Sequence, residues 1–423
     1  MDRRTTIFLL GWAFALSHSC AASAGPYEDG EVAYRSGDYA AALSLWRPLA
    51  DQGDAVAQNA LGQMYLQGKG VAVDYTQALS WFGMAADHGN ASAEVSLGFL
   101  YTRGLGVPRD FEKAVHWYSV AAGQGDAGAQ FDLGIMYENG AGAPRNLELA
   151  LSWFRKAAEQ GFASAQYSLA GMYAHGRGVP QDDATAFEWY RKAAEQGHAN
   201  AQVTLGMMYN MGVGAPQDYA AAVGWFEKAA NQGSSLGQVD LGSAYQAGHG
   251  VPQDYAQALN WFRKAADQGN SVGEYNVGVI YENGFGTTRD SLTAIAWYRK
   301  AAEKGNPAAQ SNLGVMYEKG NGVEQDYGQA IEWYRKAAEQ GFAQGQLNLA
   351  LMYQKGRGAP QDNAAAFFWF NLAASNTADL SAAAIRDMAV NLRDQLKPDM
   401  TPAQSDEAQR MAAEWTQRHP PNN

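Results

Sequence analysis

The chain has 423 residues, of which 47% are hydrophobic and 12% aromatic, enough apolar material for a large core, and this excludes an intrinsically disordered chain. Its formal net charge of −12 repels phosphate backbones, so we expect no nucleic acid as a partner. A single cysteine cannot form a disulfide within the chain, and packing must therefore supply the stability.

Residues 1–24 are predicted to be a cleaved signal peptide. Arg3 and Arg4 precede an apolar run at residues 7–16, and the small residues "ASA" end at Ala24. This three-part layout is typical of secretory signals, and the run is shorter than the roughly 20 residues that cross a bilayer. We therefore expect a periplasmic or secreted protein without a transmembrane segment in its mature chain.

The cysteine raises a second possibility, attachment of a lipid at Cys20. Ser17 stands where lipoprotein signals usually carry Leu, and the bulky polar His18 lies beside it. Because the match is poor, we do not expect lipoprotein anchoring at Cys20.

Residues 25–53 are predicted to form an N-terminal cap. The stretch "AYRSGDYAAALSLWRPLADQG", which ends at Gly53, is an imperfect copy of the helical hairpin that follows it. Its last glycine lies 36 residues before Gly89, the glycine that ends the next copy.

Residues 54–377 consist of nine units of 36 residues with no insertion. A tryptophan recurs once per unit, at positions 81, 117, 153, 189, 225, 261, 297, 333 and 369. Tyrosines and pairs of alanines recur at the same interval. Such self-similarity is typical of a solenoid, in which stacked units share one core.

Each unit is predicted to be two helices joined by a loop. In one unit the first helix, "AAQSNLGVMYEKG", ends at Gly320, where a left-handed cap is expected. Asp326 then caps the second helix, which runs through Trp333 to Gly341. The tryptophans are expected to be buried between consecutive hairpins. The predicted fold is therefore all-α.

The unit resembles the Sel-one-like repeat (SLR) family, relatives of tetratricopeptide repeat proteins. The matching residues in one unit are Ala309, Leu313, Gly314, Tyr317, Gly320, Gly322, Val323, Asp326, Ala330, Trp333, Tyr334, Ala337, Ala338 and Gly341. The resemblance implies a right-handed α/α superhelix and an adaptor that holds other proteins in a bacterial envelope. One cysteine-rich subgroup resembles β-lactam-hydrolysing proteins, but this chain lacks those cysteines.

Residues 378–418 are predicted to be C-terminal capping helices, and residues 419–423 a disordered tail. The repeat pattern stops at Thr377, where a glycine is expected. Thr401 is placed as an N-cap and Pro402 at the first helical position. Atypical ends of this kind cover the last repeat of a solenoid.

The sequence shows no catalytic, cofactor-binding or metal-binding constellation. The histidines after residue 24 are His88, His116, His175, His198, His249 and His419, and no two have the spacing of a metal-binding helix. We therefore predict a non-enzymatic protein. The alternative is a β-lactam-hydrolysing or peptidoglycan-directed protein like the cysteine-rich relatives.

A partner protein or peptide is expected to bind along the concave groove of a monomer. Positions −3 and +1, counted from the small residue that Gly314 represents, vary freely among the first helices. The candidate partner-binding residues are Phe131, Ile135, Tyr167, Val203, Met207, Tyr275 and Val279. The sequence leaves open whether these side chains face the groove or pack against the next hairpin.

Overall fold

The computed structural model describes residues 25–375 and 383–419. The predicted signal peptide, most of the predicted tail and the start of the predicted C-terminal cap lie outside the described residues. Across the described ranges the secondary structure is helical and contains no strand, which confirms the predicted all-α solenoid.

The helices of the described residues follow the predicted units. Their bounds are α1 (Pro26–Arg35), α2 (Tyr39–Asp51), α3 (Ala55–Gln67), α4 (Tyr75–Asp87), α5 (Ala91–Arg103), α6 (Phe111–Gly123), α7 (Ala127–Asn139), α8 (Leu147–Glu159), α9 (Ala163–His175), α10 (Asp183–Glu195), α11 (Ala199–Met211), α12 (Tyr219–Asn231), α13 (Ser235–Ala247), α14 (Tyr255–Asp267), α15 (Ser271–Asn283), α16 (Ser291–Glu303), α17 (Pro307–Lys319), α18 (Tyr327–Glu339), α19 (Ala343–Lys355), α20 (Asn363–Ser375), α21 (Ala383–Leu396) and α22 (Pro402–Arg418). A short 3-10 turn, Lys397–Asp399, joins the last two.

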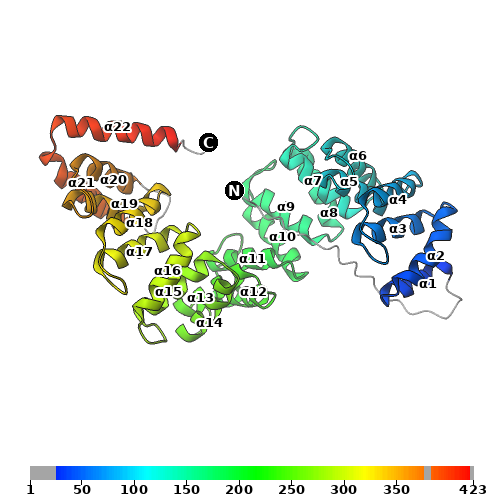
Figure 1. Cartoon of the computed structure of the whole chain (residues 1–423), viewed down its shortest axis with the longest axis horizontal. Helices are drawn as coiled ribbons and strands as arrows, with labels where there is room; N and C mark the ends of the chain where they lie inside the picture. Colours follow the sequence, from blue (N-terminus) through cyan, green and yellow to red (C-terminus); the bar gives the residue numbers. More distant parts are fainter. Residues whose placement is uncertain (1–24, 376–382, 420–423) are drawn as a thin grey trace. The chain divides into compact units, whose positions relative to one another are not determined.

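From α3 to α20 each odd-numbered helix is the first helix of a hairpin and the next even-numbered helix is the second (Figure 1). The hairpins belong to two compact units. The described parts of Met1–Ala165 with Arg177–Val179 form the first unit, and those of Gln166–Gly176 with Pro180–Asn423 form the second. Within each unit consecutive hairpins pack against each other.

Capping residues set the ends of these helices. The N-cap side chain of Asp326 accepts a hydrogen bond from the backbone N–H of Gln329 at 2.9 Å. Gly320 ends α17 with φ 70°, the left-handed conformation that glycine adopts without strain. Gly322 follows with φ 71°, and a Cβ there would lie 2.6 Å from the carbonyl oxygen of Ser291 in the preceding hairpin. The loop glycines therefore serve both the turn and the packing of neighbouring hairpins.

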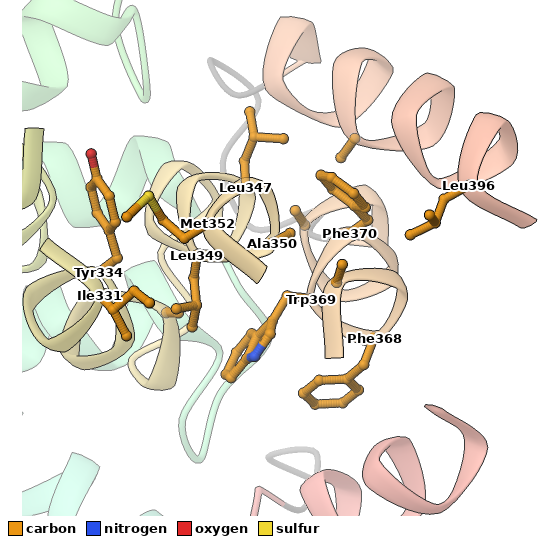
Figure 2. Close-up of a cluster of buried hydrophobic side chains, with 14 of the residues drawn as sticks. Ile331, Tyr334, Leu347, Leu349, Ala350, Met352, Phe368, Trp369, Phe370 and Leu396 are labelled. Carbon is orange, nitrogen blue, oxygen red and sulfur yellow. The ribbon is translucent and has the colours of Figure 1, made fainter. Parts of the chain in front are cut away.

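The small residue of the first helix makes room for an aromatic ring of the second. A Cβ built on Gly206 would lie 2.5 Å from Cε1 of Phe226, which is buried. Ala350 takes the place of glycine in the last hairpin and lies beside Phe370 in a buried cluster (Figure 2). The ring that fills each hairpin thus belongs to the residue that follows the recurring tryptophan.

Most of the recurring tryptophans are less buried than the sequence predicts, although Trp81 and Trp369 are buried. Trp225 packs against a cluster that includes Phe187 of α10 and Met208 of α11, so it does insert between hairpins. Its ring is only half-buried, however, and the Nζ atom of Lys228 lies 3.7 Å from the ring centroid. The outer face of this ring is covered by the aliphatic and charged ends of a lysine instead of by the core.

A buried polar side chain at position −4 of the first helix joins consecutive hairpins. Gln130 donates from Nε2 to the carbonyl oxygen of Ala122 in the preceding hairpin at 3.3 Å. Its Oε1 accepts from Nε2 of Gln160, the C-cap of its own hairpin, at 2.8 Å. Gln202, Gln238 and Gln310 repeat this arrangement in their units, whereas Glu94 and Glu274 replace the glutamine in two others.

Helices α21 and α22 cover the last hairpin. Ala389 and Leu396 of α21 belong to the same cluster as Trp369 and Phe370 of α20, and Figure 2 shows Leu396 at its edge. Trp415 of α22 packs on Trp369 with ring centroids 5.4 Å apart. The N-cap expected for α22 at Thr401 is confirmed, because its side chain accepts from the backbone N–H of Gln404.

Candidate protein-binding face

First helices of consecutive hairpins contact each other more extensively than second helices do. Within the second unit α11 contacts α13 and α13 contacts α15 directly, and among the described residues no two consecutive second helices make contacts of similar extent.

One stripe of the first helices α11, α13 and α15 is accessible to solvent. On α11, α13 and α15 it consists of positions −6, −2, +1 and +5, none of which is buried. We call this surface the open face, and its residues are Asn200, Thr204, Met207, Met211, Leu236, Asp240, Ser243, Ala247, Val272, Asn276, Val279 and Asn283. These positions lie three or four residues apart and therefore share one side of each helix.

The predicted partner-binding residues at position −3 take part in packing. The Phe131 ring lies 5.7 Å from that of Phe154 in the same hairpin and 5.4 Å from that of Phe162 at the start of the next. Tyr167 packs in the same way on Tyr190 and His198. These −3 rings are half-buried and fill the junction between hairpins.

The remaining −3 candidates pack in the same place. Tyr275 lies 5.8 Å, between ring centroids, from Tyr298 of its own hairpin and is half-buried. Val203 is 5% exposed, so its predicted place on the partner-binding surface is a correction: its side chain belongs to the core.

The predicted residues at position +1 are accessible to solvent to different extents. Met207 is 43% exposed, whereas Ile135 and Val279 are half-buried. The structure therefore brings Met207 and Val279 together with other residues of the open face, and Ile135 occupies the matching place on α7. Binding through these side chains stays a prediction.

Sequence reasoning missed the carboxylates at position −2. Asp132 on α7 and Asp240 on α13 are half-buried, and neither makes a hydrogen bond or ion pair within the described residues. Desolvation raises the pKa of Asp132 to about 7, with a further contribution from the Asp126 carboxylate, and desolvation raises the pKa of Asp240 to about 6. Neither residue caps a helix or occupies a recurring core position, and this departure from the repeat pattern could have identified them in the sequence.

Apolar side chains share the open face with Asp240. Met207, Met211, Leu236 and Val272 are between 43% and 57% exposed, and they come from three consecutive first helices. Exposed apolar groups that gather on one side of a protein are typical of a surface that contacts another molecule.

Neither a candidate metal site nor a membrane-spanning helix is found among the described residues. They contain no group of three or more His, Cys, Asp or Glu side chains placed to hold a metal ion. A membrane-spanning helix is also not found among them, since no described helix has the necessary length and apolarity.

Comparison with known proteins identifies the repeat. The Sel1 repeat model matches residues 18–54, 55–90, 91–126, 127–162, 163–198, 199–234, 235–270, 271–306, 307–342 and 343–377. The first of these matches includes the opening hairpin, α1 and α2, and the other nine correspond to the regular units.

Two solved structures are similar over most of the chain. A protective antigen with an SLR fold, present in uropathogenic Escherichia coli strains, is 33% identical with a TM-score of 0.59, and the match covers 94% of this chain and 92% of that one. A Sel1 repeat protein from Oxalobacter formigenes is 33% identical with a TM-score of 0.56, covering 79% of this chain and 96% of that one. A search of curated proteins finds no match.

Proposed function

The chain belongs to the Sel1 repeat family, whose members are generally protein–protein interaction scaffolds, and on that premise we propose that it is an exported, non-enzymatic scaffold. It holds a partner protein on the open face and acts as an adaptor or regulator in the bacterial cell envelope. The export part of the proposal rests on Arg3, Arg4 and the apolar run and small residues that follow them.

One observation carries the binding role. The positions that build the core recur in every unit, whereas the open face varies from helix to helix and keeps apolar side chains such as Met207 and Leu236 in solvent. Exposing large apolar side chains gives no stability to the free protein, and covering them with a partner releases the water that they order.

Affinity capture from an envelope extract of the producing bacterium, followed by mass spectrometry, tests this proposal. The double variant Met207→Ser/Met211→Ser removes two exposed side chains from the open face. It should no longer capture the partner protein, while its melting temperature should equal that of the parent. Met84→Ser on α4 is the matched control, because Met84 is also exposed, at 38%, but lies on a second helix. Equal capture by both variants, or no captured protein at all, argues against the proposed function.

A further inference from the structure

We propose that the open face of α11, α13 and α15 binds an extended peptide segment of the partner and receives one of its Lys or Arg side chains at Asp240. This inference rests on the proposed function, because it names the kind of segment that the same face would hold. It follows from the charges, the exposed apolar groups and the spacing of the three helices.

Asp240 differs from the other charged residues of the three helices in having no partner in the described part of the chain. None of them contains a Lys, Arg or His residue, and their acidic residues are Asp240, Glu274 and Glu282. Glu274 is paired with Lys304, whose Nζ lies 2.6 Å from Oε1, and Glu282 accepts a hydrogen bond from the Tyr298 hydroxyl at 2.6 Å. Asp240 alone has no partner within the described residues.

A partly desolvated carboxylate without a partner is unfavourable for the free protein. Water can still reach Asp240, because the side chain is only half-buried on the open face, but the surrounding chain raises its pKa to about 6. A cation brought by another molecule would restore the lost solvation and form a charge-assisted hydrogen bond. The site is therefore complementary to an ammonium or guanidinium group.

The neighbours of Asp240 determine what surrounds that cation. Leu236 lies one turn before Asp240 on α13, while Met207 and Val279 belong to the open face on the adjacent first helices α11 and α15. Apolar side chains on both sides of the cation would cover these groups. We infer a basic residue flanked by aliphatic or aromatic residues.

The spacing of the helices fits a segment that crosses them. Packed helices lie about 8–10 Å apart, so three first helices span about 20 Å, which an extended chain covers with about six residues at roughly 3.3 Å each. Asn276 at position −2 of α15 is half-buried and makes no hydrogen bond within the described residues. Its amide group can both donate and accept, as pairing with a main-chain peptide group requires.

Synthetic peptide pools test the inference on the full chain. Fluorescein-labelled peptides of nine residues carry Lys, norleucine or Glu at the centre, with Val, Leu, Ile or Thr on either side and Ser or Gly at the ends. Fluorescence polarisation at physiological salt measures binding. We expect the Lys pool to bind at least about tenfold more tightly than the norleucine pool, because only Lys can pair with a desolvated carboxylate.

The variant Asp240→Asn separates binding from folding. It should weaken the Lys pool at least about tenfold, to the level of the norleucine pool. It should also raise the melting temperature, because the desolvated carboxylate is gone, so that lost binding cannot be ascribed to unfolding. Asp267→Asn on α14 removes the same charge from an exposed position and should leave binding unchanged.

The outcomes distinguish this inference from the proposed function. The inference is overturned if neither pool binds, if the Lys and norleucine pools bind alike, or if Asp240→Asn leaves the Lys pool unaffected. If the parent and Asp240→Asn then still capture the same protein from envelope extract, the proposed function stands without the inference. Failure of capture by the parent removes the proposed function, whatever the peptides do.

Discussion

Replacing Glu94 with glutamine should stabilise the protein. Glu94 is 1% exposed and occupies the position where most units carry the glutamine that joins two hairpins. The Nε2 atom of Gln124 lies 2.8 Å from each of its carboxylate oxygens. No Lys or Arg stands at this place, unlike Glu274 with Lys304, and an ionised carboxylate has no proton to donate to the preceding hairpin.

The magnitude follows from the missing hydrogen bond and the buried charge. The complete side-chain network is present in the units of Gln130, Gln202, Gln238 and Gln310, where Nε2 donates to a carbonyl oxygen of the preceding hairpin, at 3.1 Å for Gln202. Restoring a donor and removing a desolvated charge should together stabilise the fold by about 1–3 kcal/mol at neutral pH. The pH dependence gives a second signature.

The pKa of Glu94 is raised in the folded protein, chiefly because burial desolvates its carboxylate. The hydrogen bond from Gln124 lowers this pKa, the Asp126 carboxylate raises it, and His116 lowers it. An acid whose pKa is raised by folding contributes stability below its unfolded pKa of about 4.3 and loses it as the pH rises through the folded value. The advantage of Glu94→Gln should therefore be small at pH 4 and grow to a plateau near neutral pH.

Thermal melts of both proteins, followed by circular dichroism from pH 4 to pH 8, measure this difference. Gln130→Glu is the matched reverse change, because Gln130 occupies the equivalent position in the next unit, is 5% exposed and makes the bond to the preceding hairpin that Glu94 lacks. It should destabilise by a similar amount, again more at neutral pH than at pH 4. Equal stability of Glu94→Gln and the parent at pH 7, or an advantage that is the same at every pH, would refute the reasoning.

Two further predictions concern packing. Lys304→Gln leaves the buried carboxylate of Glu274 without its cation and should destabilise by about 2 kcal/mol, and Glu274→Gln in the same chain should recover most of this loss by recreating the pair that Gln238 and Gln268 form at 2.8 Å. A double-mutant cycle measures the coupling, and additive effects would contradict it. Phe226→Ala should destabilise by about 3–5 kcal/mol and Trp225→Ala by roughly half as much, because only the phenylalanine is buried. Equal melting temperatures for these two variants would show that the tryptophan carries more of the core than its exposure indicates.

The fold could be predicted from the sequence because each level of it repeats. Gly320 and Asp326 mark helix ends in one unit, and glycine and either aspartate or asparagine mark them at an interval of 36 in the others. A local rule that holds once can be overridden by tertiary contacts, but the same rule at the same phase in nine units cannot be an accident of context. The structure confirms the hairpins for this reason.

The candidate surface could not be assigned as well, because helical phase alone does not separate adjacent positions near a boundary. Positions −3 and −2 differ by 100° on the helical wheel, and the wheel does not show how far a ring such as Tyr167 reaches toward the next hairpin. The burial predicted for the tryptophans was wrong for most of them for a related reason. Trp225 has the expected neighbours, but its size leaves one ring face to Lys228.

Glu94 and Asp240 show how a carboxylate that destabilises the fold can be tested for a binding role. Both are desolvated, and folding raises the pKa of both. Glu94 is enclosed between two hairpins, where no other molecule can reach it, so its replacement by an amide should raise stability and change nothing else. Asp240 lies on the open face, so the same chemical change should raise stability and remove the binding of a cation. If Asp240→Asn raises the melting temperature as Glu94→Gln does and leaves peptide binding intact, both carboxylates are merely unfavourable, and the open face must recognise its partner through apolar contacts alone.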